Sequence, residues 1–408
     1  MKLLTVDTIE EARQKLLNNT SHWKLPQEKP EIPCAFGRII AEDLYSPLDI
    51  PGFRRSTVDG YAVIAADTTG AGESIPALLK LTGTVEMGKP AGFCLRRGEC
   101  AYVPTGGMMP EGADAMVMIE YSEPFGSEIA IYQSAAAGSY VIQAAEDAKQ
   151  GGLLLRCGTK IRSQEIGALA AAGITNVPVY APLRLCIISS GDELVSPSAV
   201  PRPGEVRDIN TYALEALAKE SGYLVTKTKI VKDEEDALEA AVLEGMKNNQ
   251  LVVLSGGSSQ GEKDMTANVF SSVAKPGVFT HGLAIKPGKP TILAYDKVSD
   301  TILAGLPGHP VSALMVFRVL FSWFIRQLTG EKEPFPVPAA INCNLAGSPG
   351  RTTYQPVILR DFDNTYLAEP VFGKAGVINT LTNADGYIVI DMNKEGIMKG
   401  DKVQVFIW

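Results

Sequence analysis

Residues 251–264, with the sequence LVVLSGGSSQGEKD, restrict the fold of this chain more than any other stretch. The first four residues are all apolar, which is typical of a strand buried on both faces of a parallel sheet. Residues 255–257 follow directly, and their small side chains leave backbone amides open to an anion. Charged residues at 262–264 then begin the next helix. The stretch therefore predicts a parallel strand that ends in a loop suited to phosphate and metal together.

The loop differs from a Walker A motif, although Gly256 and Gly261 have the Walker A spacing. The next three residues are Glu262, Lys263 and Asp264, so the lysine comes one position late and no Ser or Thr follows it. This difference excludes a P-loop nucleoside triphosphatase. Two interpretations of the loop stay open at this point, a phosphate-binding loop and an ordinary glycine-rich connection.

The composition is that of a soluble, folded protein. Hydrophobic residues make up 45% and charged residues 21% of the 408 residues, and this length predicts about two to four domains. The net charge of -8 argues against nucleic acid or an anionic membrane as a partner. The six cysteines form no CxxC pair, which favours a reduced cytoplasm. We expect neither a signal peptide nor an apolar run long enough to span a membrane.

The region 182–330 alternates apolar strands with amphipathic helices, which predicts a parallel sheet flanked by helices. Ligands of such sheets bind at the carboxyl ends of the strands, where four acids are expected: Asp192, Glu193, Asp233 and Asp264. Because four carboxylates at one edge repel each other, they predict that a cation or a cationic ligand binds among them. Asp233 has an alternative structural role as the N-cap of the helix that follows it.

Lys286 and Lys289 stand on either side of a stiff Pro-Gly turn in HGLAIKPGKP. Two neighbouring ammonium groups repel each other, and they suit an oxyanion or a phosphate. The alternative is that both are solvated surface charges. The motif GLPGHPVSA follows and opens a long apolar helix, expected at residues 311–328.

Short alternating runs broken by glycine and proline fill residues 47–143 and predict an inserted β-rich domain. Its flanks, residues 1–46 and 144–181, are expected to form one split domain. In that domain a serine-capped helix at residues 163–173 would pack on a first helix at residues 7–18, which is capped by Asp7 or Thr8.

Residues 331–408 consist of strand-like runs and predict a terminal β domain.

In the inserted domain, a stiff loop carries neighbouring residues of mixed charge, which predicts a functional site. The alternative is a surface loop with solvated charges. Its candidate residues are Arg54, Arg55, Ser56 and Asp59.

Eight motifs, in the same order along nearly the whole chain, resemble the molybdopterin molybdotransferase family, which includes the C-terminal domain of gephyrin. They are STVDGYA, PTGGMMPEGADAMVM, AAEDA, SSGDELV, LSGGSSQGEKD, AIKPGKP, GLPGHPVSA and GRTTYQPV. The resemblance implies a multidomain α/β plus β fold. Its parts are a central α/β parallel-sheet domain of the molybdopterin-binding type, an inserted β domain, a split α/β domain and a C-terminal β-barrel-like domain.

The resemblance also implies an activity. Enzymes of this family insert molybdate into adenylylated molybdopterin, release AMP, use Mg²⁺, and act as elongated homodimers whose site lies between the subunits. Molybdopterin adenylyltransferase and other cofactor-pathway enzymes are the implied partners. By the same resemblance, Asp59 and Asp147 face the site from the partner subunit, Glu193 and Asp264 hold magnesium, and Asp233 assists. Lys286 and Lys289 would neutralise pyrophosphate and molybdate. The implied cofactor-binding residues are Thr105, Ser255, Gly256, Gly257, Pro307, Gly308 and Arg351.

The chain departs from the family pattern at three places. It has Thr57-Val58 where the family usually has Ala-Met, and His309 where asparagine is usual. Residues 143–145, QAA, replace two arginines and a glycine before Glu146, so this loop offers less positive charge to an anion. The alternatives are therefore a tungstate-inserting or turnover-deficient relative that binds the pterin, or a gephyrin-like binding scaffold.

Overall fold

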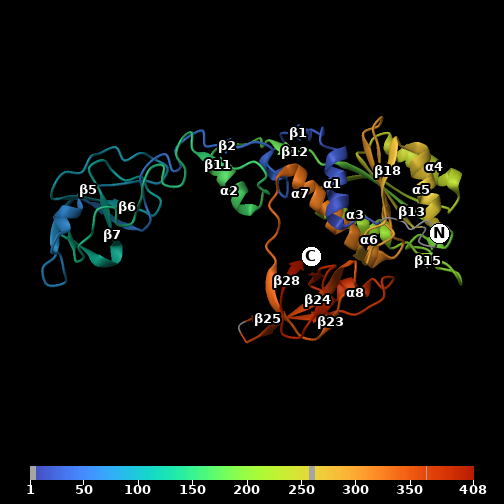
Figure 1. Ribbon diagram of the computed structural model, residues 1–408. Helices are drawn as coiled ribbons and strands as arrows, with labels where there is room; N and C mark the ends of the chain where they lie inside the picture. Colours follow the sequence, from blue (N-terminus) through green and yellow to red (C-terminus); the bar gives the residue numbers. More distant parts are fainter. Residues whose placement is uncertain (1–5, 257–261, 364) are drawn as a thin grey trace.

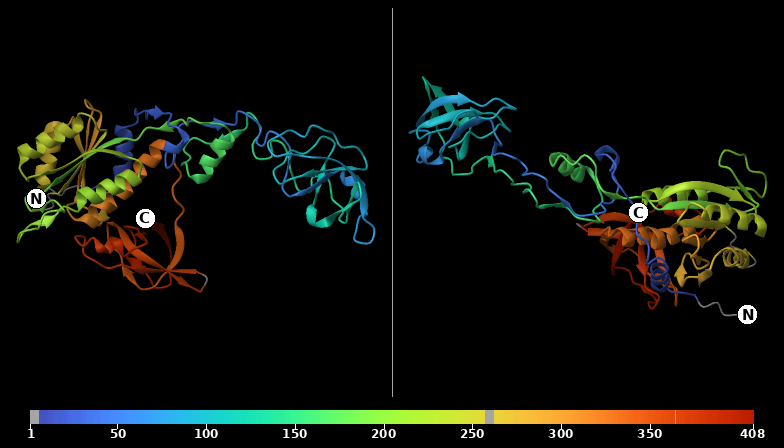
Figure 2. Two further views of the ribbon diagram at one scale, coloured as in Figure 1. Left: turned by 180° about the vertical axis from the view of Figure 1, so that it is seen from behind. Right: turned by 90° about the horizontal axis from the view of Figure 1, so that it is seen from above.

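The structure, a computed structural model, describes residues 6–256, 262–363 and 365–408, except for the side chains of residues 262–264. Figures 1 and 2 show an elongated molecule with a small β domain at one end. Two extended segments join this domain to a body that contains the central α/β domain, and the C-terminal β domain lies against the body.

The central domain contains a six-stranded sheet in the order β16-β13-β17-β21-β20-β18. The first four strands pair in parallel, as the sequence predicts, but β20 is antiparallel to both of its neighbours. Only four residues join β20 to β21, and a parallel pair needs a crossover of about a dozen. The strands are β13 (Arg184–Ser190), β16 (Leu224–Val231), β17 (Leu251–Gly256), β18 (Pro276–His281), β20 (Ile292–Asp296) and β21 (Thr301–Leu306).

Helices cover both faces of this sheet. On one face α3 (Asn210–Glu220) packs in the largest core cluster, and on the other α4 (Glu235–Met246) and α5 (Glu262–Val273) form a second cluster. The N-cap of α4 is Glu234, which makes no side-chain cap hydrogen bond, so the expectation that Asp233 caps this helix is wrong. The short pair β14 (Leu194–Val195) and β15 (Val206–Arg207) precedes α3.

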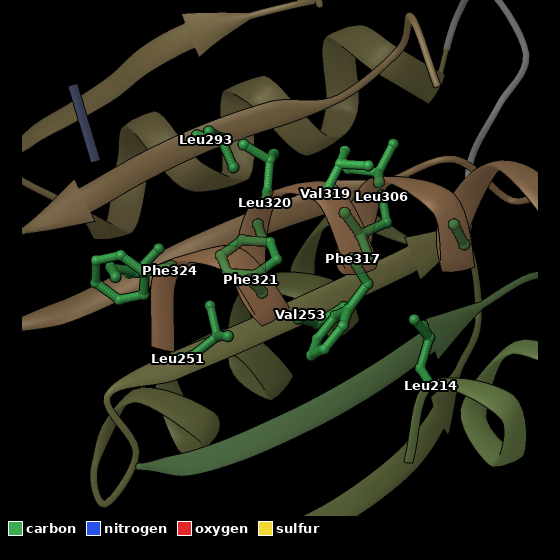
Figure 3. Packing of buried hydrophobic residues seen from close by; sticks show 14 of the residues in the cluster. Leu214, Leu251, Val253, Leu293, Leu306, Phe317, Val319, Leu320, Phe321 and Phe324 are labelled. Atoms are coloured by element: carbon green, nitrogen blue, oxygen red, sulfur yellow. The ribbon is translucent and has the colours of Figure 1, made fainter. Parts of the chain in front are cut away.

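The long apolar helix runs through α6 (Pro310–Phe317), a π-helical turn η4 (Arg318–Ser322) and α7 (Trp323–Thr329). Figure 3 shows its aromatic residues Phe317, Phe321 and Phe324 packed over Leu251 and Val253 of β17. The helix has 20 residues and a mean hydropathy of 1.4, so its length and composition would allow it to cross a membrane. The expectation that the chain has no apolar run of this length is therefore wrong. The helix is 67% buried inside the protein, which is the position of a core helix.

Helix α1 (Ile9–Asn19) begins with a capping box between Thr8 and Glu11 and buries Ile9, Ala12 and Leu16, as the sequence predicts. Its buried face joins the core of the central domain. Helix α2 (Ser163–Ala171) instead packs on the 3-10 helix η1 (Ile32–Cys34), so the expected packing of α2 on α1 is wrong. The N-cap of α2 is Arg162 rather than a serine.

Residues from both flanks of the insertion pair with each other. β1 (Gln27–Glu28) pairs with β12 (Val179–Tyr180), and β2 (Leu44–Tyr45) pairs with β11 (Leu153–Leu155). A small core containing Ile40, Ile161 and Leu169 draws on both flanks.

The inserted domain contains a six-stranded sheet with two apolar clusters. Its order is β7 (Ala115–Met118), β4 (Gly60–Val63), β6 (Glu99–Val103), β5 (Ala77–Thr84), β9 (Glu128–Ile131) and β8 (Ser122–Phe125). The 3-10 helices η2 (Ala65–Thr68) and η3 (Ile119–Tyr121) accompany it. The short pair β3 (Arg55–Ser56) and β10 (Val141–Ile142) lies where the domain joins the body.

The C-terminal domain is a closed barrel, because β24 pairs with both β25 and β26 and so completes the ring β24-β25-β22-β28-β26. A strand from the central domain, β19 (Ile285–Lys286), adds to β24 in parallel. The elements are β22 (Val337–Ile341), β23 (Leu345–Ala346), β24 (Thr352–Phe362), β25 (Thr365–Pro370), α8 (Asn379–Thr382), β26 (Gly386–Ile390), β27 (Gly396–Ile397) and β28 (Lys402–Ile407).

Candidate functional site

A cavity of about 390 Å³ lies at the carboxyl ends of β13 and β17, beside the first residues of α3 and α6. Ligands of open α/β sheets bind at this edge. The cavity brings together five residues that the sequence predicted for the site: Glu193, Asp233, Ser255, Gly256 and Gly308. They come from four separate segments of the chain.

The backbone at the end of β17 requires glycine. Gly256 has φ +148°, and a Cβ atom at this position would lie 2.2 Å from the carbonyl oxygen of Ser190. The preceding Ser255 is buried, and its hydroxyl accepts a hydrogen bond of 2.8 Å from the Asn210 side-chain amide. The end of β17 is therefore packed tightly against the end of β13 and the start of α3.

The segment after β21 forms another wall. The carbonyl oxygen of Gly308 accepts a hydrogen bond of 2.7 Å from Asn210 Nδ2, while Pro307 is buried and its carbonyl lies 3.5 Å from Ser255 Oγ. The C-terminal domain closes this wall, since Gly376 lines the cavity and a Cβ there would lie 3.2 Å from the His309 ring. Two domains of one chain thus build the cavity.

Three residues with carboxylate side chains line the cavity, and two of them, Glu193 and Asp233, were predicted for the site from the sequence; the third is Asp208. Mg²⁺ is commonly bound by one or two carboxylates together with substrate phosphates, so this donor set fits the ion. Within the described residues no cluster of three or more His, Cys, Asp or Glu side chains is present. Gly257 and the side chain of Asp264 lie outside the described parts, so their predicted roles rest on the sequence.

The lysine turn lies at the junction between the central and C-terminal domains. Lys286 is opposite Thr353 in the β19–β24 pair, and Arg351 directly precedes β24. Both Lys286 and Lys289 are exposed, and neither pairs with a carboxylate in the part of the chain that the structure covers. The junction therefore carries three basic groups, but none of them lines the 390 Å³ cavity.

Asp59, Thr105 and Asp147 lie where the inserted domain joins its two connecting segments. Asp59 Oδ1 accepts a hydrogen bond of 2.9 Å from the Thr105 amide, so these two residues are in contact. The amide of Asp147 donates to the carbonyl of Ile50, which belongs to the neighbouring connecting segment. All three predicted residues are exposed, and none of them lines the cavity of the same chain. Figure 1 shows the inserted domain far from that cavity's strands.

Several cavity residues were not singled out from the sequence. They are Ser189, Ser190, Arg207, Asp208, Asn210 and, as a lining residue, His309. The polar segment RDINT, residues 207–211 at the start of α3, was the available signal, but such residues at a helix start are usually read as caps. The N-cap of α3 is Ile209, and Asp208 Oδ1 accepts a hydrogen bond of 3.1 Å from the Thr211 amide in the first turn.

The fold and the cavity define a multidomain α/β protein with a cavity at the carboxyl edge of its central sheet, the edge at which such sheets bind ligands. The chain matches three family models in succession. They are the MoeA N-terminal region (domains I and II) over residues 7–173, a probable molybdopterin-binding domain over 186–327, and the MoeA C-terminal region (domain IV) over 338–408.

Known proteins with names from the same family are similar to this chain over most of its length. A putative molybdopterin biosynthesis protein of Methanocaldococcus jannaschii is 32% identical over 92% of this chain and 91% of its own length. A molybdopterin molybdenumtransferase of Nostoc is 31% identical over 91% of this chain and 86% of its own. The crystal structure of a molybdopterin biosynthesis MoeA protein from Pyrococcus horikoshii has 33% identity and a TM-score of 0.78, covering 99% of both chains. The chain belongs to the MoeA family.

Proposed function

We propose that this chain is a molybdopterin molybdenumtransferase that inserts molybdate into adenylylated molybdopterin and releases AMP. The observation that carries the proposal is the cavity at the ends of β13 and β17, where carboxylates, hydroxyls and a glycine-rich strand end meet. Relatives that bear this enzyme name match most of the chain, which supports the choice of reaction.

The reaction requires groups that neutralise charge rather than a protein nucleophile. Breaking a phosphoanhydride bond places negative charge on phosphate oxygens, and lysines or backbone amides stabilise that charge. Lys286 and Lys289 would supply the positive charge that stabilises pyrophosphate and molybdate. The amides after Ser255 would bind phosphate. No cysteine occurs among the described residues that line the cavity.

Magnesium is part of the proposal. Glu193 and Asp233 would hold the ion together with substrate phosphates, and Asp264 is the further ligand that the sequence indicates. When bound, Mg²⁺ supplies positive charge to oxygens that become more negative as the phosphoanhydride breaks. The two carboxylates would orient the ion, and Ser255 would hold the phosphate loop in place through its contact with Asn210.

We also propose that two copies of this chain form a homodimer. A homodimer would bring the inserted domain of one chain, with Asp59, Thr105 and Asp147, to the cavity of the other. Free cysteines and the acidic net charge are compatible with a cytoplasmic enzyme that binds neither nucleic acid nor membrane. Molybdopterin adenylyltransferase is the expected supplier of the adenylylated substrate.

Substitution of Glu193 tests the function. The purified protein is mixed with adenylylated molybdopterin, Mg²⁺ and either molybdate or tungstate, and AMP release is followed by chromatography. We expect the wild type to release AMP with molybdate and Glu193→Gln to do so roughly 100-fold more slowly, because a carboxylate that orients the metal is lost. Chelation with EDTA should stop AMP release by the wild type.

The control is Glu215→Gln, which removes one carboxylate from α3 outside the cavity. It should leave AMP release unchanged, and all three proteins should unfold at similar temperatures. A wild type that binds the substrate but releases no AMP with either oxyanion would contradict the proposed reaction. Equal rates for wild type and Glu193→Gln would contradict the placement of the site.

A further inference from the structure

The side chain of Arg55 is exposed where the inserted domain joins its connecting segments, and it has no partner in the described parts of the chain. Its neighbour Arg54 differs, because that guanidinium donates to the carbonyl oxygens of Ala113 at 2.7 Å and Pro110 at 3.5 Å. Arg54 therefore has a structural role within the domain. The N–H donors of Arg55 are available to a ligand.

Strand β3 places Arg55 beside residues that the sequence predicted for the site. The amide of the next residue, Ser56, donates to the Gly107 carbonyl at 3.0 Å. In the same turn the Thr105 amide donates to Asp59 Oδ1 at 2.9 Å. Arg55 thus lies next to the pair Asp59 and Thr105, which the proposed homodimer would bring to the cavity of the other chain.

A second exposed donor lies close to Arg55 in the chain. Ser56 is only 2% exposed, whereas Arg55 and Thr57 on either side of it are exposed, so both of these side chains point away from the packed side of the segment. The Thr57 hydroxyl has no partner among the residues that the structure describes. Because the family usually has alanine at this position, the chain adds a hydroxyl two residues from an unpaired guanidinium.

The partner strand β10 leads into the loop in which this chain lacks positive charge. Arg55 lies directly opposite Ile142, and residues 143–145 follow, where QAA replaces two arginines and a glycine. The loop backbone still has a shape that favours glycine, since Ala145 has φ +62° and its amide donates to the Pro51 carbonyl at 2.9 Å. The loop therefore fits the family pattern in shape and departs from it in charge, and Arg55 lies on the neighbouring strand.

This arrangement suits an oxyanion. A guanidinium can donate two parallel hydrogen bonds to two oxygens of a phosphate or a similar anion, and it stays charged near neutral pH. The nearby Thr57 hydroxyl can donate to a third oxygen. The alternative, a solvated surface charge, predicts that Arg55 can be removed without any effect on ligand binding.

We propose that Arg55 and Thr57 form an anion subsite that the inserted domain contributes to the shared site, in place of the arginines absent from positions 143 and 144. The guanidinium binds two oxygens of the anion and the hydroxyl binds a third. The anion is a tetrahedral oxyanion, supplied either as molybdate or as a phosphate group of the adenylylated molybdopterin. The inference rests on the proposed function for the identity of this ligand.

Calorimetric titration tests the subsite and separates the two sources. Molybdate and adenylylated molybdopterin are titrated separately into the full chain in buffer free of Mg²⁺, so that no AMP is released. We expect Arg55→Gln to weaken binding of the ligand whose anion it holds by about tenfold, because charge-assisted hydrogen bonds are lost. Thr57→Ala should weaken binding of the same ligand by about threefold.

A rescue variant tests whether the subsite replaces the absent arginines. Gln143→Arg and Ala144→Arg, added together to Arg55→Gln, return positive charge to the neighbouring segment and should restore affinity to within about threefold of the wild type. The control is Arg96→Gln, which removes an exposed arginine. Arg96 precedes β6 whereas Thr105 follows it, so the control lies at the other end of that strand and should bind both ligands as the wild type does.

Four results overturn the inference. They are binding of both ligands by Arg55→Gln within about twofold of the wild type, an equal loss of affinity in Arg96→Gln, no gain of affinity in the rescue variant, and no binding of either ligand by the wild type at millimolar concentration. Because the Arg55 side chain makes no contact in the described parts, all variants with this change should unfold at the temperature of the wild type.

Failure of this inference differs from failure of the proposed function. Normal AMP release, with unchanged binding in Arg55→Gln, would overturn the anion subsite alone. Weakened binding in Arg55→Gln, in a protein whose wild type binds the substrate but releases no AMP, would overturn the proposed reaction and leave the subsite in place.

Discussion

Gly288 fixes the turn that presents Lys286 and Lys289. It has φ +115°, and a Cβ atom there would lie 2.4 Å from Val316 Cγ2 and 2.9 Å from Ile285 Cδ1. Both neighbours are fully buried and cannot move aside without disturbing the core. A larger residue would therefore push the lysine turn away from helix α6.

We expect Gly288→Ala to lower the free energy of unfolding by about 3 kcal/mol, because it combines overpacking with an unfavourable φ. Gly167→Ala is the matched control, since Gly167 lies within α2 and its Cβ would meet nothing within 4 Å. That change should raise the free energy of unfolding by about 0.5–1 kcal/mol. Urea unfolding measures both, and a Gly288→Ala protein as stable as the wild type would contradict the packing described here.

Single residues show where prediction from the sequence ends. The sequence singles out Lys286 and Lys289 because a Pro-Gly turn between two lysines is unusual in itself, and their role stays a prediction. Asp208 and Asn210 were missed because a helix start with Asp and Asn has an ordinary explanation. What makes them unusual is burial without a hydrogen-bond partner, and that depends on Ser255 and Gly308, which lie far away in the sequence.

Asp300 connects the turn between β20 and β21 to the segment that follows α1. Its carboxylate accepts hydrogen bonds from His22, Trp23 and Tyr295. Burial alone would raise the pKa of Asp300, but the hydrogen bonds from Tyr295, Trp23 and His22 outweigh it and lower the pKa below its usual value. Burial, together with the hydrogen bond to the same carboxylate, raises the pKa of Tyr295.

A lowered pKa means that this carboxylate stabilises the fold above the unfolded-state pKa of about 3.9 and loses that effect as the pH falls below it. We expect Asp300→Asn to cost roughly 1 kcal/mol at pH 7, a value reduced by the partial exposure of the group, and almost nothing near pH 3. Urea midpoints across this range measure the difference. Asp361→Asn, on an exposed part of β24, should show no such pH dependence. A cost for Asp300→Asn that stays constant from pH 3 to 7 would contradict the assignment.

Local sequence patterns predict the individual strands and helices, but they do not predict which elements pair or pack with each other. The apolar run of β17 and the capping box of α1 predict a buried strand and a helix start, and both are present. The antiparallel β20, the packing of α1 on the central core and the addition of β19 to the C-terminal barrel were not predicted. These pairings depend on surfaces far apart in the chain, which hydrophobic periodicity does not report.

At the scale of the whole molecule, the predicted site residues form separate groups. Glu193, Asp233, Ser255, Gly256 and Gly308 share one cavity. Asp59, Thr105 and Asp147 lie where the inserted domain joins its connecting segments, and Figure 1 shows that domain far from the strands of the cavity. The sequence order of the motifs could not reveal this separation, because motif matches carry no distances. In the proposed homodimer, a second copy would bring its inserted domain to the cavity of the first.

Pairing of two defective chains tests this arrangement. One chain carries Asp59→Asn and one tag, the other carries Glu193→Gln and a second tag, and the mixed dimer is isolated by both tags after co-expression. If each site uses the inserted domain of one chain and the cavity of the other, one site of the mixed dimer is intact and the other has both defects. We therefore expect about half of the wild-type rate of AMP release, whereas each variant alone should be nearly inactive.

If instead each chain completed its own site, both sites of the mixed dimer would carry one defect and AMP release would stay at the level of the single variants. A dimer of two differently tagged Asp59→Asn chains controls for the effect of tagging and should be inactive. Failure to recover any doubly tagged species would show that the chain does not dimerise, and the inserted domain would then need another explanation for its position. Because half-activity arises only when residues from both ends of the molecule act across a subunit boundary, this measurement separates the shared site from the alternatives.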